Sequence, residues 1–167
     1  PLGVLTVVEN RQVPLRQAPG LSLAAAQEPP PQLAVFSDGD GPGAITRFDG
    51  RREPLAYLDF LTSAIPYHLL PRPHVLVLGA GSGQDVLQAL YHRAPAVDAV
   101  ELNAQMLELV QNRFAAFSGR PYSQPGVRAH QAEARGFVAG GSARYDLIQL
   151  SLVDAYGASS AGLHALS

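Results

Sequence analysis

The sequence contains no cysteine. A chain without thiols can form no disulfide bond, no thiolate nucleophile and no cysteine-based zinc site, and this suits a reducing compartment. Long apolar runs are also absent, because charged residues interrupt every stretch of about 18 residues, the length that a membrane helix needs. The first residues lack the basic segment and apolar core of a secretory signal. We therefore expect a cytoplasmic location, either as a free protein or as the cytoplasmic domain of a membrane protein.

An excess of one charge sign is lacking as well. The 12 Lys and Arg residues stand against 14 Asp and Glu, for a formal net charge of −2, and the basic residues are scattered. No basic stripe of the kind that holds a nucleic-acid backbone is present, so nucleic acid is not expected as a partner. A length of 167 residues predicts about one main domain. Because the sequence starts at Pro1 and ends at Ser167, we expect it to be part of a longer polypeptide.

The first 50 residues contain short strand-like segments separated by Pro and Gly clusters. The segments LTVV (5–8) and LAVF (33–36) favour strands, while QEPPPQ and SDGDGPGA break the pattern. We predict a small β-hairpin lobe over residues 1–50. Apolar residues then recur at helical spacing from Leu55 to Ile65, and Pro66 interrupts the pattern, so a helix should lead into the second unit.

Residues 51–167 are predicted to form the N-terminal part of a nucleotide-binding α/β domain. Asn103 is a good N-cap for a helix whose core stripe is Met106, Leu107, Val110, Phe114 and Phe117. Alternating strands and helices are typical of a Rossmann-like parallel sheet with flanking helices. Four strands leave an open sheet edge, so further strands are expected beyond Ser167. The predicted strands are 75–78, 97–101, 127–131 and 145–150, and the predicted helices are 83–92, 103–117 and 134–139.

A glycine-rich turn follows the first of these predicted strands. In the segment VLVLGAGSGQD (75–85), glycine occupies positions 79, 81 and 83. This lets the backbone turn tightly and lets a ligand approach it without meeting a Cβ atom. A dinucleotide fingerprint needs its third glycine one position later, where this chain has Gln84. The spacing therefore favours an adenosyl sulfonium ligand such as S-adenosylmethionine over NAD or FAD.

Two carboxylates follow the next two predicted strands. Glu101 ends the second strand, where it can accept hydrogen bonds from both ribose hydroxyls, and the alternative is a solvated charge. Glu133 follows the third strand, where it can accept the adenine amino group or equally cap the next helix. The predicted adenosyl-binding residues are Gly79, Ala80, Gly81, Ser82, Gly83, Glu101, Leu102, Glu133 and Ala134.

Signatures of other chemistries are missing. The sequence has no GK[ST] phosphate loop and no H-E-x-x-H zinc motif. It has no G-x-S-x-G esterase elbow either, because Gln84 stands where the last glycine would follow Ser82. Its five histidines are isolated from one another in the sequence, so no metal site is expected.

Several motifs together resemble the spermidine synthase family of aminopropyltransferases, within the class of S-adenosylmethionine-dependent methyltransferase folds. The resemblance covers most of the chain. It implies a donor that is S-adenosylmethionine or its decarboxylated form, a small-molecule acceptor such as a polyamine, and a homodimer. The motifs are DGDG (38–41), YLDFL (57–61), PRPHVLVLGAGSG (71–83), VDAVELN (97–103), YSQPGVRAHQAEARGFV (122–138) and YDLIQLSLVD (145–154).

The resemblance also assigns residues to the reaction, and the sequence departs from the family at some of them. The family's catalytic aspartate, which helps to deprotonate the attacking amine, falls on Ser151, so Asp154 is the remaining candidate base. Leu58 replaces a polar residue of the family. On either side of it, Tyr57 and Asp59 keep the family's character and are expected to contact the acceptor substrate.

Three functions remain open on these residues. Ser82 stands where aminopropyltransferases carry an aspartate that would repel the carboxylate of S-adenosylmethionine, so the first hypothesis is methyl transfer to an acceptor held beyond Asp154. The second is aminopropyl transfer from decarboxylated S-adenosylmethionine to a polyamine held by Asp59, with Asp154 as the base. The third is a non-catalytic nucleotide-binding module of a larger protein, for example one fused to membrane-spanning segments, which Ser151 and Leu58 favour.

Overall fold

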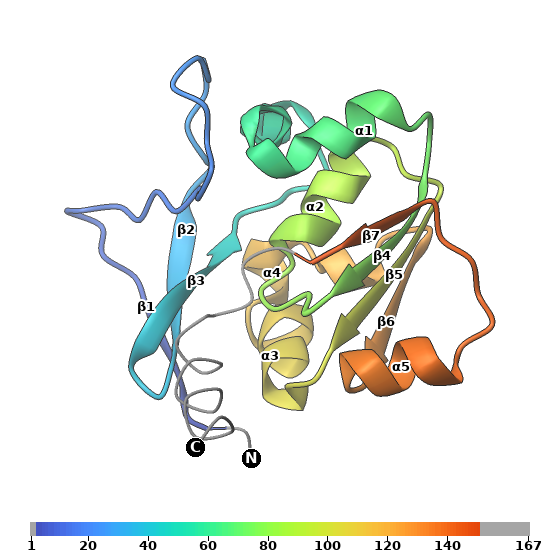
Figure 1. Cartoon of the computed structure of the whole chain (residues 1–167). Helices are drawn as coiled ribbons and strands as arrows, with labels where there is room; N and C mark the ends of the chain where they lie inside the picture. The colour runs from blue at the N-terminus through green and yellow to red at the C-terminus, as the bar shows by residue number, and fades with distance from the viewer. Residues whose placement is uncertain (1–2, 151–167) are drawn as a thin grey trace, which may run out of the picture.

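The N-terminal part of the chain forms a small antiparallel sheet. The computed structural model describes residues 3–150, without the side chains of residues 40–42. The strands β1 (Leu5–Val8), β2 (Gln32–Ser37) and β3 (Asp40–Thr46) lie in that order across the sheet. This sheet stands to one side of a larger sheet and faces the arrowheads of its strands (Figure 1).

The sequence pattern predicts β1 and β2 but not β3. Gly and Pro are depleted in strands, and β3 contains both. The strand lies at the edge of its sheet, where proline is tolerated because one side of the strand has no partner. Asp38 and Gly39 form the turn before it, with φ angles of 51° and 83°. Asp-Gly is a strong hairpin signal. This pair therefore indicates the hairpin between β2 and β3, although the surrounding Pro and Gly residues obscure the strand pattern.

The second sheet is parallel and contains the strands β4 (His74–Leu78), β5 (Ala96–Glu101), β6 (Val127–Gln131) and β7 (Leu147–Gln149). Their order is β6-β5-β4-β7. The chain therefore proceeds outward from β4 to β6 and then returns to the other side of β4. In an open parallel sheet, such a reversal of strand order opens a crevice at the carboxyl ends of the strands. The predicted Rossmann-like α/β architecture is confirmed.

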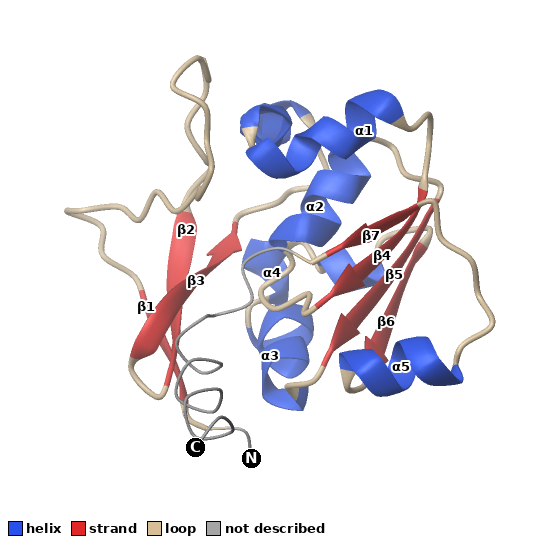
Figure 2. Ribbon diagram, viewed as in Figure 1, coloured by secondary structure: helices blue, strands red, loops and turns tan. Residues whose placement is uncertain are grey.

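Helices cover the parallel sheet, and α2 and α5 lie on opposite sides of it (Figure 2). Between residues 3 and 150 no helix combines the length and the apolar character needed to cross a lipid bilayer. The α-helices are α1 (Ile65–Leu69), α2 (Gln84–Tyr91), α3 (Ala104–Glu108), α4 (Ala115–Ser118) and α5 (Ala134–Gly140). Two 3₁₀ segments, η1 (Glu53–Phe60) and η2 (Thr62–Ala64), precede α1; a π segment, η3 (Leu109–Arg113), follows α3; and a 3₁₀ turn, η4 (Pro121–Ser123), precedes β6.

Two predicted helices differ from the observed ones. The helix expected from Leu55 to Ile65 is instead the 3₁₀ pair η1 and η2, and Pro66 does not end a helix but lies in the first turn of α1. Proline fits there because the first amide groups of a helix have no intrahelical acceptor in any case. The helix expected over residues 103–117 begins as predicted, with the Asn103 side chain accepting a hydrogen bond from the Gln105 amide, but the π segment η3 divides it.

One hydrophobic core joins the two sheets. Side chains of β4 and β5, including Val75, Val77 and Val97, belong to the same buried cluster as Leu33 and Ile45 of the small sheet. The small sheet is thus packed against the larger one. This contact fixes the position of β3 relative to the carboxyl ends of the parallel strands.

A chain of buried hydrogen bonds crosses from β7 to the helices. The Tyr67 hydroxyl donates to the Gln149 side chain at 2.6 Å, the Gln149 amide donates to Gln88 at 2.8 Å, and the Gln88 amide donates to the carbonyl of Leu58 at 2.8 Å. Gln88 is fully buried. Buried amide groups must be paired in this way, so the chain fixes β7 against α1, α2 and η1.

Candidate nucleotide-binding site

The glycine-rich turn between β4 and α2 has the shape of a ligand-binding loop. Gly79, Gly81 and Gly83 adopt positive φ angles of 71°, 53° and 93°, which side-chain-bearing residues rarely adopt. The amides of Gly79 and Ala80 both donate to the carbonyl of Val100, at 2.9 and 3.0 Å, and tie the turn to the end of β5. A Cβ atom on Gly79 would meet nothing within 4 Å, so open space adjoins the backbone there. These features fit a nucleoside-type ligand.

Glu101 reaches the turn from the last position of β5. One carboxylate oxygen accepts a hydrogen bond from the Gly81 amide at 2.7 Å, and the other accepts from the Asn103 amide at 2.7 Å. The side chain is only partly buried. Charged acceptors form the stronger hydrogen bonds, so the carboxylate is held firmly between the glycine turn and the start of α3. Glu101 is therefore not a freely solvated charge.

A residue that the sequence analysis did not select, Tyr122, braces the same turn. Its hydroxyl, which lies in the 3₁₀ turn η4, donates to the carbonyl of Gly81 at 2.6 Å, and the side chain is buried. Burial, followed by the nearby carboxylates of Glu101 and Asp85, raises the pKa of Tyr122 well above its ordinary value. The hydroxyl therefore remains a donor. Tyr122 opens the motif YSQPGVRAHQAEARGFV (122–138), but no periodic signal in the sequence indicates its contact with Gly81.

Ser82 lies between the glycine turn and the small sheet. A Cβ atom placed on Gly43 in β3 would stand 3.9 Å from the Ser82 hydroxyl oxygen. The half-buried Ser82 side chain is thus directed toward β3. The small sheet is therefore close enough to border any ligand that the glycine turn binds.

Glu133 acts as a helix cap in this structure. Its two carboxylate oxygens accept hydrogen bonds from the amides of Arg135 and Gly136, at 2.9 and 2.7 Å, at the start of α5. These backbone hydrogen bonds lower the pKa of Glu133. Ala134 is the first residue of α5, and Leu102, beside Glu101, has an exposed side chain. The cap alternative for Glu133 is observed, and its role toward adenine stays a prediction.

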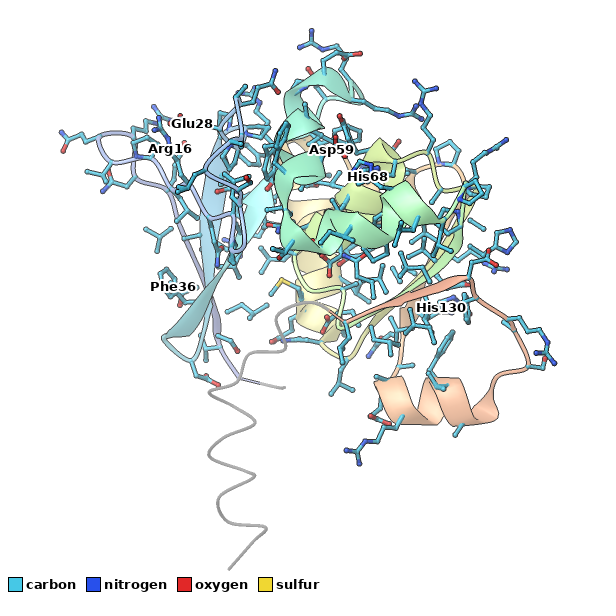
Figure 3. All side chains as sticks on the ribbon, turned by 45° about the horizontal axis from the view of Figure 1, so that its top comes forward. Arg16, Glu28, Phe36, Asp59, His68 and His130 are labelled. Atoms are coloured by element: carbon cyan, nitrogen blue, oxygen red, sulfur yellow. The ribbon has the colours of Figure 1, made fainter. Side chains whose placement is uncertain are left out.

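The structure does not bring Tyr57 and Asp59 to the glycine turn. Tyr57 is fully buried and offers no surface to an acceptor, and burial raises its pKa to about 12. The Asp59 carboxylate lies 3.0 Å from His68 and 3.5 Å from His92, as Figure 3 illustrates for Asp59 and His68. His92 ends α2, whose first turn follows the glycine loop, so about 12 Å of helix separates Asp59 from that loop. The acceptor-binding role of this pair stays a prediction.

The remaining predicted residues, Ser151 and Asp154, lie outside the described residues. No group of three or more His, Cys, Asp or Glu side chains within residues 3–150 is arranged to hold a metal ion.

A second polar cluster surrounds Asp98 in β5. His130 and Arg128 in β6 contact its carboxylate at 2.7 and 2.8 Å, and the Tyr145 hydroxyl donates to it at 3.1 Å. Burial alone would raise the pKa of Asp98, but the hydrogen bonds from His130, Arg128 and Tyr145 outweigh burial and lower the pKa. The His130 ring packs against Phe137 of α5 at 4.8 Å between centroids. The cluster therefore joins β5, β6 and α5 as a structural element.

We expect this cluster to make stability depend on pH in acid. Because the pKa of Asp98 is lower when the protein is folded, the carboxylate stabilises the fold above its ordinary unfolded pKa, and this stabilisation is lost as pH falls below about 4. Asp98→Asn should lower the free energy of unfolding at pH 7 by about 1–3 kcal/mol and flatten its acid dependence. Urea titrations from pH 3 to pH 7 measure both effects. Glu28→Gln, at an exposed ion pair with Arg16, is the control and should change the free energy of unfolding little. Equal pH profiles for the wild type and Asp98→Asn would contradict the stabilising role of Asp98.

Comparison with known proteins gives one sequence relative and a shared fold. No known family profile matches the sequence. The polyamine aminopropyltransferase of Korarchaeum cryptofilum is 29% identical over 83 residues, which cover 50% of this chain and 26% of that protein. The crystal structure of spermidine synthase from Thermotoga maritima superposes with a TM-score of 0.55 at 18% identity, over 78% of this chain and 46% of that one.

A second solved structure supports the same fold. Spermidine synthase in complex with the transition-state analogue AdoDATO superposes with a TM-score of 0.53 at 21% identity, over 80% of this chain and 46% of that one. Similarity at these identities shows the fold alone. The chain spans about half the length of the solved structures that it matches, and about a quarter of the curated relative.

Proposed function

Because the chain is spermidine synthase-like in sequence and in fold, we propose that it carries the nucleotide-binding half of an aminopropyltransferase. In this proposal the glycine turn and Glu101 bind decarboxylated S-adenosylmethionine, and the acceptor is a polyamine. The predicted resemblance is confirmed, whereas the first hypothesis, methyl transfer, gains no support from the relatives found.

The contact between Glu101 and the glycine turn is the observation that carries the proposal. Each carboxylate oxygen has two lone-pair sites and uses one of them for a backbone amide, of Gly81 or of Asn103. The second site on each oxygen can accept a ribose hydroxyl. A vicinal diol matches two acceptors held side by side, so this geometry suits a nucleoside sugar.

The proposed reaction is a displacement at carbon. An amine nitrogen of the polyamine attacks the aminopropyl carbon that is bonded to the sulfonium sulfur of the donor. The C–N bond forms, the C–S bond breaks, and its electron pair passes to sulfur, which becomes a neutral thioether. The amine loses one proton, for which Asp154 is the proposed acceptor since serine stands at position 151. Holding donor and acceptor in line can contribute about 7–11 kcal/mol at best.

Ser82 bears on the choice of donor. A serine exerts no charge repulsion on the carboxylate of S-adenosylmethionine, so this site should discriminate against that compound less strongly than a site with an aspartate. Preference for the decarboxylated donor must then come from other contacts. The two donors should consequently be compared directly in both binding and turnover.

Turnover by the full-length protein tests the proposal. With decarboxylated S-adenosylmethionine and putrescine, we expect mass spectrometry to detect methylthioadenosine and an aminopropylated amine in equal amounts. Asp154→Asn should lower the rate about 10²–10⁴-fold, the usual contribution of a general base. Asp49→Asn, at an exposed carboxylate bonded to Arg51, should leave the rate unchanged. Release of S-adenosylhomocysteine from S-adenosylmethionine would indicate methyl transfer instead, and binding without turnover of either donor would reduce the domain to a nucleotide-binding module.

A further inference from the structure

A cavity of about 680 Å³ lies at the end of the parallel sheet opposite to the glycine turn. Among the residues that line it, Arg72 precedes β4, Pro95 precedes β5 and Pro125 precedes β6. Parallel strands all begin at the same edge of a sheet, so these residues meet at the amino ends of the strands. In Figure 1 this is the end away from the arrowheads and from the small sheet. We call it the basal cavity.

Three arginines line the basal cavity, and their charges are not neutralised by the described part of the chain. Among residues 3–150, the guanidinium groups of Arg52, Arg72 and Arg93 make no hydrogen bond or ion pair. Their neighbours differ: Arg51 is bonded to Asp49, and Arg128 to Asp98. The carboxyl end of α2 adds only about half a negative charge, which three guanidinium groups exceed.

The backbone at two of these arginines is strained. Arg72 and Arg93 have φ angles of 52° and 59°, in the left-handed region where Gly, Asn and Asp are favoured. Among the described residues, only four residues other than glycine have a positive φ angle. Two of these four, Arg72 and Arg93, line the basal cavity. Strain of this kind persists where the surrounding structure requires it, and it concentrates at ligand sites. At Arg93 the left-handed backbone closes the end of α2, where the Ala94 amide donates to the carbonyl of Ala89 at 3.0 Å. The backbone at Arg72 is thus the observation that is separate from the charge, and it lies at the same cavity.

From this juxtaposition of Arg52, Arg72 and Arg93 around one cavity, we propose that the chain has a second binding site, for a small, multiply charged oxyanion. Guanidinium groups bind phosphate and carboxylate oxygens through paired N–H donors, and three of them match an anion with two or more charges. The apolar side chains of Leu90, Ala94, Pro95 and Pro125 complete the lining, so the anion can carry a small organic part. The site is independent of the proposed transferase function.

His92 forms part of the wall but supplies none of this charge. Burial is the main cause of its lowered pKa, so the ring is neutral at neutral pH. The ring stacks on Tyr67 at 4.6 Å between centroids, and its Nε2 atom faces the carboxylate of Asp59 at 3.5 Å. The anion is therefore bound by the arginines, while His92 forms part of the wall of the cavity.

Titration of the full-length protein with pyrophosphate and, separately, with citrate tests the site and distinguishes phosphoryl from polycarboxylate ligands. In isothermal titration at constant ionic strength, we expect one of them to bind with a dissociation constant below about 1 mM. Arg72→Asn and Arg93→Asn should each weaken binding about tenfold or more. Asparagine removes the charge and tolerates a left-handed backbone, so these variants should fold.

Arg120→Asn is the matched control, because Arg120 also has a positive φ, 53°, and does not line the cavity. It should bind the anion as the wild type does. If the Arg72→Asn and Arg93→Asn variants fail to fold, Arg52→Gln provides the test, because the φ angle of Arg52, −86°, is ordinary. The proposal is overturned if neither anion binds more than chloride does, if Arg52→Gln binds unchanged, or if Arg120→Asn weakens binding equally. Adenosyl binding should stay unchanged in every one of these variants.

Discussion

Glu101→Gln is expected to abolish most of the affinity for adenosyl compounds. The carboxylate accepts from the amides of Gly81 and Asn103, and it is proposed to accept from both ribose hydroxyls. Glutamine keeps one acceptor oxygen, but its NH₂ group would face one of the two backbone amides. Two hydrogen-bond donors would then oppose each other, and that hydrogen bond would be lost. Loss of charge-assisted hydrogen bonds costs about 1.5–3 kcal/mol each. Two such losses predict binding weaker by about 10²–10⁴-fold.

Isothermal titration with decarboxylated S-adenosylmethionine, and with methylthioadenosine as a product analogue, measures this effect. Glu108→Gln is the matched control, because Glu108 lies at the end of α3 with an exposed side chain and makes no hydrogen bond to the glycine turn. The control should bind both compounds as the wild type does. If Glu101→Gln kept an affinity within threefold of the wild type, the nucleoside would have to bind elsewhere and the proposed function would lose its main support.

Features set by local chemistry could be predicted from the sequence. The Asn103 cap was expected because a side-chain amide oxygen before a helix accepts the N2 or N3 amide, and the structure contains that bond to Gln105. The strand 127–131 was predicted with its observed bounds, since the segment VRAHQ follows the turn residues Pro125 and Gly126. The parallel arrangement followed from the alternation of strands and helices.

Features set by tertiary contacts could not be predicted. The role of Tyr122 depends on η4 reaching back to Gly81, across 41 positions of sequence, and nothing local signals it. The contacts of Asp59 with His68 and His92 join segments far apart in the sequence, and no local pattern predicts them. The division of the helix over 103–117 by a π segment likewise has no propensity signal.

The two ends of the parallel sheet therefore differ in chemistry. At the carboxyl ends, backbone amides and the Glu101 carboxylate offer hydrogen bonds suited to a nucleoside that carries hydroxyl donors. At the amino ends, three guanidinium groups border a cavity and suit an anion. The helix α2 extends from the glycine turn to His92, which lies in the wall of the basal cavity, so it connects the two ends.

Gly83→Ala is expected to have the largest effect on stability. Gly83 caps α2 with φ at 93°, and a Cβ atom there would lie 2.9 Å from Pro121 Cγ, whose ring cannot swing away as a flexible side chain could. A left-handed alanine costs about 1–2 kcal/mol and the crowding at Pro121 about 1–3 kcal/mol, so the free energy of unfolding should fall by about 2–5 kcal/mol. Urea denaturation followed by circular dichroism measures the change.

Two further substitutions separate the causes of this effect. Gly79→Ala has the positive φ of 71° but open space around the new Cβ, so only the backbone cost of about 1–2 kcal/mol should appear. Gly140→Ala, at the end of α5, has neither a positive φ nor a neighbour within 4 Å and should stay within about 0.5 kcal/mol of the wild type. If Pro121 and Tyr122 of η4 hold the glycine turn in place, the loss in free energy of unfolding should decrease in the order Gly83, Gly79, Gly140. Equal losses at Gly83 and Gly79 would mean that η4 yields to the added methyl group and does not fix the turn.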